Sequence, residues 1–363
     1  MSAYSSTINS AISYEEKEEL IYKLLSDFSP YTSIRIIKEL EGKTELDPER
    51  NPGLSINDFI NYEKNFHGRE MFEYLYPIWA LIHKLEQYDY LIPTGDKKML
   101  LNLGKCYMSL CKMDEFDKDS MTSYAEFLGI DYIRYKVSPY VVPIIGKSEN
   151  GDIHMGSGTL INSDTILTCA HVLAGMRVDE TVCIGDKIVE IEKCIWNQDK
   201  ERRSPDVGLI KLKSSVSVGK DIVFGEGTIL NEILTIGYPP VPWMRDAYQI
   251  SQRGEINAVT IDYNNFKHFV YSSITRPGNS GGPVFSDKGL LIGMTTEHLE
   301  KKDGDSYITI PDNYSSEDAL VAVVDQINNQ SRSIVPFYAG LTAEEIIKEI
   351  EILVPGISLN QLS

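Results

Sequence analysis

The spacing of hydrophobic residues changes along the chain near residue 135. Before this point apolar residues recur mainly at the three- and four-residue intervals of amphipathic helices. After it they form short alternating runs separated by Gly, Pro and Asn, which are typical of antiparallel strands. The pattern therefore predicts two kinds of domain, with a boundary between residues 134 and 135.

The front part, residues 1–134, is predicted to be helical. Its first helix is the best marked, because Ser13 followed by Glu16 is a capping-box pattern and Leu20, Leu24 and Leu25 then share one face. The predicted helices cover residues 13–28, Thr32–Leu40, Ile56–Phe66, Met71–Gln87, Lys97–Met113 and Ser120–Leu128. These segments have no repeat period and carry no chemical motif, so we expect a small helical bundle with a regulatory or interaction role.

The part from residue 135 to residue 330 is predicted to be rich in strands. The predicted strands are Tyr140–Gly146, Gly158–Ile161, Thr165–Leu167, Val182–Ile184, Val189–Ile195, Val207–Leu212, Ile229–Ile236, His268–Ile274 and Leu290–Met294. Many short strands at such spacing indicate a sandwich or barrels.

Helical patterns return after these strands. One helical run is predicted from Asp318 to about Asn329, and a last helix, capped by Thr342 and Glu345, is predicted to reach Leu353. Residues 331–363 are therefore expected to form a C-terminal helical extension. The sequence is compatible with its packing on either domain.

The strand-rich part offers a nucleophile for attack on a peptide bond. Such attack needs a base, a group that orients the base, and N–H donors for the oxyanion. Ser280 lies in Arg276–Pro283, where glycines on both sides permit a φ-positive backbone that aims successive amides at one point. The N–H groups of Gly278 and Ser280 are therefore the expected oxyanion donors.

Two other segments supply the base and the group that orients it. His171 lies in Leu167–Val172 at the end of a predicted strand, so its ring can project from a strand terminus. Asp206 lies in Ser204–Ile210, a polar loop that enters an apolar strand, which is how a carboxylate comes to be buried beside an imidazole. Taken singly, a serine beside glycines, a loop aspartate and a histidine are usually structural. Their common context predicts a catalytic triad of His171, Asp206 and Ser280.

Thr-Cys-Ala-His, Pro-Asp-Val-Gly-Leu-Ile and Gly-Asn-Ser-Gly-Gly-Pro-Val occur in this order in one strand-rich region. Together they resemble the three signatures of the trypsin-like, chymotrypsin-clan serine peptidases. Gly156–Thr159 before the histidine and Ile236–Pro239 before the serine resemble the bacterial, HtrA-type branch. The resemblance covers roughly Tyr135 to Gln326.

This resemblance implies a multidomain α + β chain, in which a helical bundle precedes a double antiparallel β-barrel of chymotrypsin type and short C-terminal helices. His171 and Asp206 would come from the first six-stranded barrel and Ser280 from the second, with the active site in the cleft between them. The implied activity is that of a serine endopeptidase working through an acyl-enzyme, which requires no metal or organic cofactor. A catalytically silent, protease-like scaffold or adaptor is the alternative.

The resemblance also implies a specificity pocket. Its expected residues are Ile274 and Thr275 at the base, Met294, Thr295 and Thr296 along one wall, and Thr309 along the other. An isoleucine at the base disfavours a buried salt bridge to Arg or Lys, so we expect a small or medium apolar side chain before the scissile bond. Glu297 follows the pocket wall and would either meet a basic side chain or lie in a solvated loop.

Two departures from the family pattern bear on regulation. Asn279 stands where secreted trypsins carry the aspartate that pairs with a newly cut N-terminus, and some 135 residues precede the peptidase region. Activation by that route is disfavoured, so we expect residues 1–134 to control the enzyme by binding a protein partner. Helical adaptors fused to such peptidases resemble effectors of bacterial stress and antiviral defence.

Composition and charge exclude several classes of partner and site. The net charge is −18 and the sequence shows no basic stripe, so nucleic acid is not an expected partner. Five cysteines without paired spacing disfavour a disulfide framework and a zinc site. The first thirty residues lack a signal-peptide pattern and no apolar run reaches the ~20 residues of a membrane span, so we expect a cytoplasmic protein.

Overall fold

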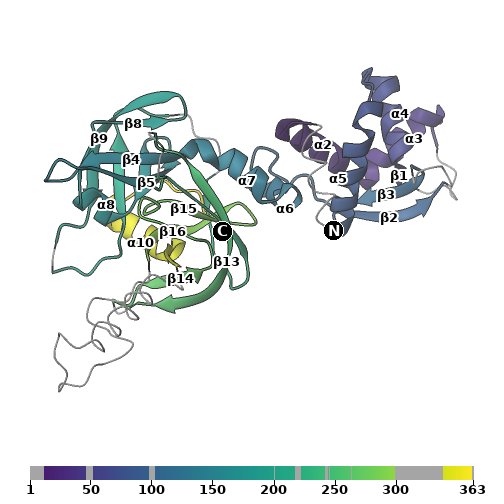
Figure 1. Cartoon of the computed structure of the whole chain (residues 1–363). Coiled ribbons are helices and arrows are strands. Elements are labelled where there is room, and N and C mark those ends of the chain that lie inside the picture. The colour runs from purple at the N-terminus through teal and green to yellow at the C-terminus, as the bar shows by residue number, and fades with distance from the viewer. Residues whose placement is uncertain are drawn as a thin grey trace, which may run out of the picture. The chain divides into compact units, whose positions relative to one another are not determined.

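The computed structural model describes residues 12–45, 52–97, 103–199, 201–216, 222–241, 244, 246–262, 264–298 and 338–361. The chain divides into two compact units, Met1–Leu128 and Gly129–Ser363 (Figure 1). This division falls just before the predicted boundary at 134/135, because helix α7 (Ile130–Val137) packs against a strand of the second unit. The described residues 338–361 belong to the second unit.

The first unit packs helices against a small sheet. The helices are α2 (Tyr14–Asp27), α3 (Pro30–Glu41), α4 (Ile56–His67), η1 (Phe72–Tyr74), α5 (Leu75–Gln87) and α6 (Thr122–Leu128). The predicted capping box of Ser13 and Glu16 is confirmed, and Ser55 with Asp58 forms a second one at the start of α4. Both boxes satisfy N–H groups that a helix start otherwise leaves unpaired.

The predicted helix over Lys97–Met113 is wrong. Lys105–Ser109 forms strand β3, the middle strand of a three-stranded antiparallel sheet with β1 (Leu54–Ser55) and β2 (Leu91–Asp96). The apolar residues of a short segment fit either period, and here pairing with two neighbouring strands decides. The first unit is therefore helical with an added sheet.

The second unit begins with α7 and the short helix η3 (Ser138–Tyr140), followed by an open seven-stranded sheet in the order β7-β4-β5-β6-β10-β9-β8. Its strands are β4 (Val141–Lys147), β5 (Ile153–Asn162), β6 (Thr165–Thr168), β7 (Arg177–Val178), β8 (Thr181–Ile184), β9 (Lys187–Trp196) and β10 (Gly208–Leu212). Helix α8 (Ala170–Ala174) follows β6 directly, so the end of β6 fixes where α8 starts. The predicted strands of this region are confirmed.

A second sheet closes on itself. Its strands are β11 (Val223–Phe224), β12 (Glu232–Gly237), β13 (Ile250–Ile261), β14 (Lys267–Tyr271), β15 (Pro283–Ser286), β16 (Leu290–His298) and β17 (Tyr338–Thr342). The order is β11-β16-β15-β12-β13-β14-β17, and the additional pairing of β16 with β17 closes six of these strands into a barrel. Closure leaves these six strands without an open edge.

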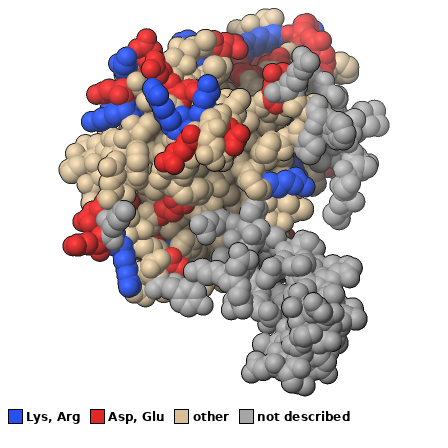
Figure 2. Space-filling view, turned by 60° about the vertical axis from the view of Figure 1, so that its left-hand side comes forward, with Lys and Arg blue, Asp and Glu red and all other residues tan. Residues whose placement is uncertain are grey.

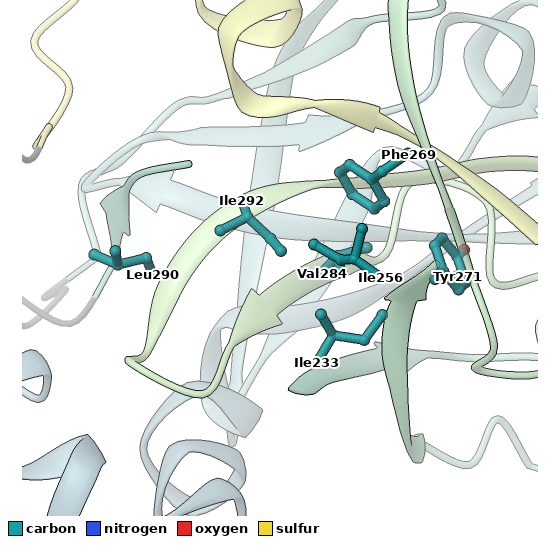
Figure 3. Packing of buried hydrophobic residues seen from close by; sticks show 7 residues of the cluster. All are labelled: Ile233, Ile256, Phe269, Tyr271, Val284, Leu290 and Ile292. Carbon is teal, nitrogen blue, oxygen red and sulfur yellow. The ribbon is translucent and has the colours of Figure 1, made fainter. Parts of the chain in front are cut away.

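The barrel core is a cluster of buried side chains shared by its strands. Figure 3 shows Ile233 of β12, Ile256 of β13, Phe269 of β14 and Val284 of β15 turned toward one another. Each such side chain contributes about 1.5–3 kcal/mol when it is removed from water. This core holds in place the strands that flank Ser280.

The predicted fold class is confirmed: helices precede antiparallel sheets of chymotrypsin type, and a short helix follows them. The first sheet is an open half-barrel, whereas a closed one was expected. The last helix, α10 (Ala343–Leu353), begins after Thr342 as predicted, but the Thr342 side chain makes no capping hydrogen bond. The helical run predicted for residues 318–329 lies outside the described residues.

On the face shown in Figure 2, Lys and Arg side chains lie among Asp and Glu side chains and form no single stripe. All five cysteines are free thiols. Within the described part of the chain, no helix has the length and hydrophobicity needed to span a bilayer.

Candidate active site

His171 and Asp206 are brought together by two neighbouring strands. His171 lies in α8, directly after β6, and Asp206 lies just before β10, which pairs with β6. The ring Nδ1 of His171 lies 2.6 Å from Oδ2 of Asp206, and the backbone N–H of His171 donates to Oδ1 at 2.9 Å. One carboxylate therefore fixes both the ring and the backbone of the histidine.

The Asp206 carboxyl favours its charged form. Burial alone would raise its pKa, but hydrogen bonds from the ring and backbone of His171 and from the Cys169 thiol outweigh burial and lower the pKa below its usual range. A carboxylate that stays ionised holds a proton on Nδ1 of His171. The other ring nitrogen, Nε2, is then available as a base.

The loop that carries Asp206 is anchored from two sides. The side-chain amide of Asn197 lies 3.0 Å from the carbonyl of Arg202 and 2.8 Å from Oγ of Ser204. The Arg202 guanidinium forms a two-point ion pair with Glu349 of α10, one contact being 2.9 Å, and Glu349 is only 2% exposed. The C-terminal helix therefore takes part in placing the Asp206 loop.

Ser280 sits on a tight turn made by its neighbours. The N–H of Asn279 donates to the carbonyl of Arg276 at 2.9 Å, and the N–H of Gly282 donates to the carbonyl of Asn279 at 2.8 Å. Gly278 and Gly281 have φ of 96° and 86°, which other residues adopt at a cost of about 1–2 kcal/mol. This turn requires its glycines.

Several other peptide groups of the turn are hydrogen-bonded to the strands around it. The carbonyl of Gly278 accepts from the hydroxyl of Ser157 at 2.7 Å, and the carbonyl of Ser280 accepts from the N–H of Ser157 at 2.9 Å. The N–H of Gly281 donates to the carbonyl of Thr295 at 2.9 Å. Within the described residues, the N–H groups of Gly278 and Ser280 have no acceptor, which leaves both available to a ligand oxygen.

The Ser280 hydroxyl donates to the backbone carbonyl of Thr296, at 3.0 Å. A hydroxyl has one hydrogen, so this hydrogen is not donated to His171 in the present arrangement. Rotation about the Ser280 side-chain bond would redirect it. The structure therefore shows a resting orientation of the serine.

Small residues around Ser280 are required by packing as well as by backbone conformation. A Cβ on Gly281 would lie 2.1 Å from the carbonyl oxygen of Ser157 and 2.3 Å from Oγ1 of Thr168. A Cβ on Gly282 would lie 2.2 Å from the carbonyl oxygen of Ile236. These short distances show that the Ser280 turn packs directly against strands of both sheets.

Residues 156–294 match the family model of the trypsin-like peptidase domain. The chain contains a trypsin-like peptidase domain. Trypsin theta of Drosophila melanogaster is 32% identical over 98 residues, a match that covers 24% of this chain and 36% of the relative. The chain thus spans about a third of the length of the curated relative it matches.

Solved structures similar to this chain include two proteases. The active form of the Rv3671c protease from M. tuberculosis is 19% identical with a TM-score of 0.43, over 63% of this chain and 86% of that one. The HtrA-type protease AlgW with a tripeptide is 18% identical with a TM-score of 0.42, over 62% of this chain and 63% of that one. The fold assignment rests on the strand pairing and the family match.

The residues predicted to form the specificity pocket lie in different environments. Ile274 is 47% exposed, whereas Thr275, Met294, Thr295 and Thr296 are all buried. The Thr295 hydroxyl lies 3.2 Å from that of the buried Tyr271, and Thr296 provides the carbonyl that holds Ser280. Thr309 and the side chain of Glu297 lie outside the described part of the chain.

A cavity of about 610 Å³ opens beside Asp206. Its walls come from Ser204–Asp206, from the tip of the β13–β14 hairpin including Phe266 and His268, and from Thr296 and Ala339. Sequence patterns predicted a strand over His268–Ile274 but did not indicate that this hairpin or Ala339 lies beside Asp206, because their positions depend on how the barrel closes.

Among the described residues, one group of three side chains has the chemistry of metal ligands. The ligand atoms of Cys169, His171 and Asp206 lie within 4.8 Å of one another. The hydrogen bond between His171 and Asp206 uses Nδ1 of the ring, so a metal ion at this atom would have to displace it. The arrangement as it stands orients a base.

Proposed function

We propose that the chain is a serine endopeptidase with Ser280 as nucleophile, His171 as general base and Asp206 as the group that orients the base. The observation that carries this proposal is the Ser280 turn, in which the N–H groups of Gly278 and Ser280 have no acceptor among the described residues, whereas those of Asn279, Gly281 and Gly282 do. Two convergent amides beside a nucleophile are what a developing oxyanion requires. The bond between His171 and Asp206 supplies the other half of the site.

The proposed reaction proceeds in two halves. Oγ of Ser280 attacks the peptide carbonyl while its proton passes to Nε2 of His171, and the oxyanion binds the two free amides. His171 then gives this proton to the leaving amine, and the C–N bond breaks to leave an acyl-enzyme. Water, deprotonated by His171, attacks the ester and releases the new carboxylate with Ser280 restored.

The resting bond from Ser280 to Thr296 adds one step before attack. The hydroxyl must leave the Thr296 carbonyl and turn toward His171. Thr296 lies where the pairing of β16 with β17 is interrupted, between Thr295 and His298. A substrate N–H that donates to the Thr296 carbonyl there would compete with Ser280 and favour the rotation of its hydroxyl. We propose that substrate binding is coupled in this way to alignment of the nucleophile.

The proposed substrate is a protein or peptide with a small or medium apolar side chain before the scissile bond. The described pocket residues Ile274, Thr275, Met294, Thr295 and Thr296 support this preference, because none of them carries a charge that would hold Arg or Lys. Comparison of peptides that differ only at this position, with Ala, Val, Leu or Arg, tests it. Faster cleavage after Arg would contradict the proposal.

We further propose that residues 1–134 control the peptidase through a protein partner, in the cytoplasm and in a stress or antiviral response. Their separate compact unit, Met1–Leu128, supports such a role. On α5, Tyr76 and Trp79 are 42% and 39% exposed; the Trp79 ring stacks on His83 and lies tilted to Tyr76, which gives this unit an aromatic surface. Replacing Trp79 by Ala in the full chain should alter partner-dependent activity and leave basal activity unchanged.

Labelling with a fluorophosphonate tests the catalytic proposal. The wild type should be labelled at one residue, Ser280, whereas Ser280→Ala should not be labelled and His171→Ala should be labelled at least about 100-fold more slowly. Ser286→Ala is the matched control, because Ser286 is a buried serine of the same unit whose hydroxyl caps the β15–β16 turn. Absence of labelling in a folded wild type, with or without residues 1–128, would favour the scaffold alternative.

A further inference from the structure

Ser157 of β5 lies fully buried where the first sheet meets the Ser280 turn. Its hydroxyl accepts a hydrogen bond from the N–H of Tyr238 at 2.8 Å and donates to the carbonyl of Gly278 at 2.7 Å. The single hydroxyl hydrogen is therefore committed to the Gly278 carbonyl, and the Tyr238 amide fixes the direction in which it points.

The backbone of Ser157 holds two further parts of the site. Its N–H donates to the carbonyl of Ser280 at 2.9 Å, and its carbonyl accepts from the Thr168 hydroxyl at 2.7 Å, three residues before His171. Pro143, which has no N–H, stands opposite Ser157 in β4. Because Pro143 has no N–H to donate to Ser157, the N–H and the carbonyl of Ser157 bond to Ser280 and Thr168 instead.

The hydrogen bond from the Ser157 hydroxyl to the Gly278 carbonyl bears on the orientation of the Gly278 N–H. Gly278 offers one of the two free amides and has a φ of 96°. Glycine visits positive and negative φ about equally readily, so its own backbone does not select the conformer that aims its N–H at a substrate oxygen. A bond to its carbonyl from a buried, oriented hydroxyl selects that conformer before substrate arrives.

The Ser157 hydroxyl is closely packed by the neighbouring backbone. A Cβ on Gly237 would lie 3.0 Å from Oγ of Ser157 and 2.7 Å from Oδ1 of Asn279, so the backbone before Tyr238 packs directly on the serine. Removal of one oxygen from so close a contact leaves less space than a water molecule needs. Loss of the hydroxyl would leave the Tyr238 amide and the Gly278 carbonyl without this partner.

We propose that Ser157 is a positioning residue that fixes the oxyanion-binding conformer of Gly278 and couples it to the His171 segment through Thr168. This inference rests on the proposed serine peptidase function. It assigns a role in transition-state binding to a strand residue of the first sheet, whereas the two oxyanion donors belong to the second. Ser157 should therefore affect kcat far more than KM, because substrate in the ground state does not yet carry the oxyanion.

The test compares Ser157→Ala with Ser286→Ala in the full chain. Both variants remove one buried hydroxyl from the peptidase domain, but the Ser286 hydroxyl accepts from the N–H groups of Lys288 and Leu290 and lies in the β15–β16 turn. We expect Ser157→Ala to lower kcat by about 10- to 100-fold with KM within about two-fold, a part of the effect of removing an oxyanion donor outright. Ser286→Ala should lower the melting temperature without changing kcat.

A readout independent of turnover completes the test. Hydrogen exchange of a peptide spanning residues 276–282, measured by mass spectrometry, should be faster in Ser157→Ala than in the wild type and unchanged in Ser286→Ala. Unchanged exchange together with unchanged kcat in folded Ser157→Ala would overturn the inference. A wild type without Ser280-dependent labelling would instead refute the proposed function, and the exchange difference would still decide the positioning role of Ser157.

Discussion

Asp27 places a carboxylate inside the first unit, and its ionisation should make that unit less stable as the pH rises. Asp27 is 9% exposed, and its Oδ2 lies 3.9 Å from the Lys23 ammonium. Lys23 lies closer to Glu63, at 2.9 Å, and Glu63 is itself fully buried. Burial raises the pKa of Asp27 from 3.8 to about 6, with Glu63 adding to the rise and Lys23, Arg35 and His67 opposing it.

The sign and size of the effect follow from the two pKa values. The folded unit holds the Asp27 proton more tightly than the unfolded chain, so the contribution of Asp27 to stability is greatest below about pH 4 and is lost as the pH rises through about 6. A rise of about two pKa units, at 1.36 kcal/mol each, corresponds to about 3 kcal/mol lost by neutral pH. Asp27→Asn should recover about 1–3 kcal/mol at pH 7.5, because the amide also gives up the attraction of Lys23.

Urea denaturation followed by the fluorescence of Trp79 measures this effect. Trp196 and Trp243 are replaced by Phe in every variant, so that the signal comes from the first unit alone. The quantity compared is the difference in unfolding free energy between Asp27→Asn and its parent from about pH 4 to about pH 8, with Asp114→Asn as the exposed control. Parallel curves, or an Asp27→Asn variant that is less stable at pH 7.5, would refute the reasoning.

Three further predictions concern the peptidase domain. Asp206→Asn should lower kcat by about 10³–10⁴ with little change in melting temperature, because the amide no longer keeps the proton on Nδ1 of His171. A decrease in kcat of less than about 10-fold in a steady-state assay would contradict the proposed triad. Gly281→Ala should cost more than about 2 kcal/mol of unfolding free energy and abolish labelling, whereas Gly151→Ala, with a similar φ of 87° and nothing within 4 Å, should cost only about 1–2 kcal/mol. Glu349→Gln should lower both stability, by about 1–3 kcal/mol, and kcat, whereas Glu351→Gln on the exposed side of the same helix should change neither, as denaturation and steady-state rates would show.

The sequence predicted the parts of the site that are encoded locally. The segments around His171, Asp206 and Ser280 each combine a reactive residue with a strand end or a glycine turn, so their context is readable within a few residues. The structure brings His171 and Asp206 together as expected. Neighbouring strands β6 and β10 achieve this, and both were predicted.

The parts that escaped prediction depend on contacts distant in sequence. Strand β13 carries many polar and exposed residues, so its alternation is weak, and β17 is fixed by pairing with β14 and β16. Lys105–Ser109 was mistaken for helix because its strand partners lie elsewhere in the chain. The role of Ser157 needs contact with a turn more than a hundred residues later, which no local pattern encodes.

The way β17 closes the barrel has a consequence for the newborn chain. The ribosome makes β16 and the Ser280 turn well before Tyr338–Thr342, the strand that covers the open side of β16. Until then the carbonyls of Thr295 and Thr296, which hold the turn and the serine, belong to an unfinished edge. Domains fold as units during synthesis. The Ser280 turn should therefore reach its folded arrangement late in synthesis, once β17, the last strand among the described residues, has paired with β16.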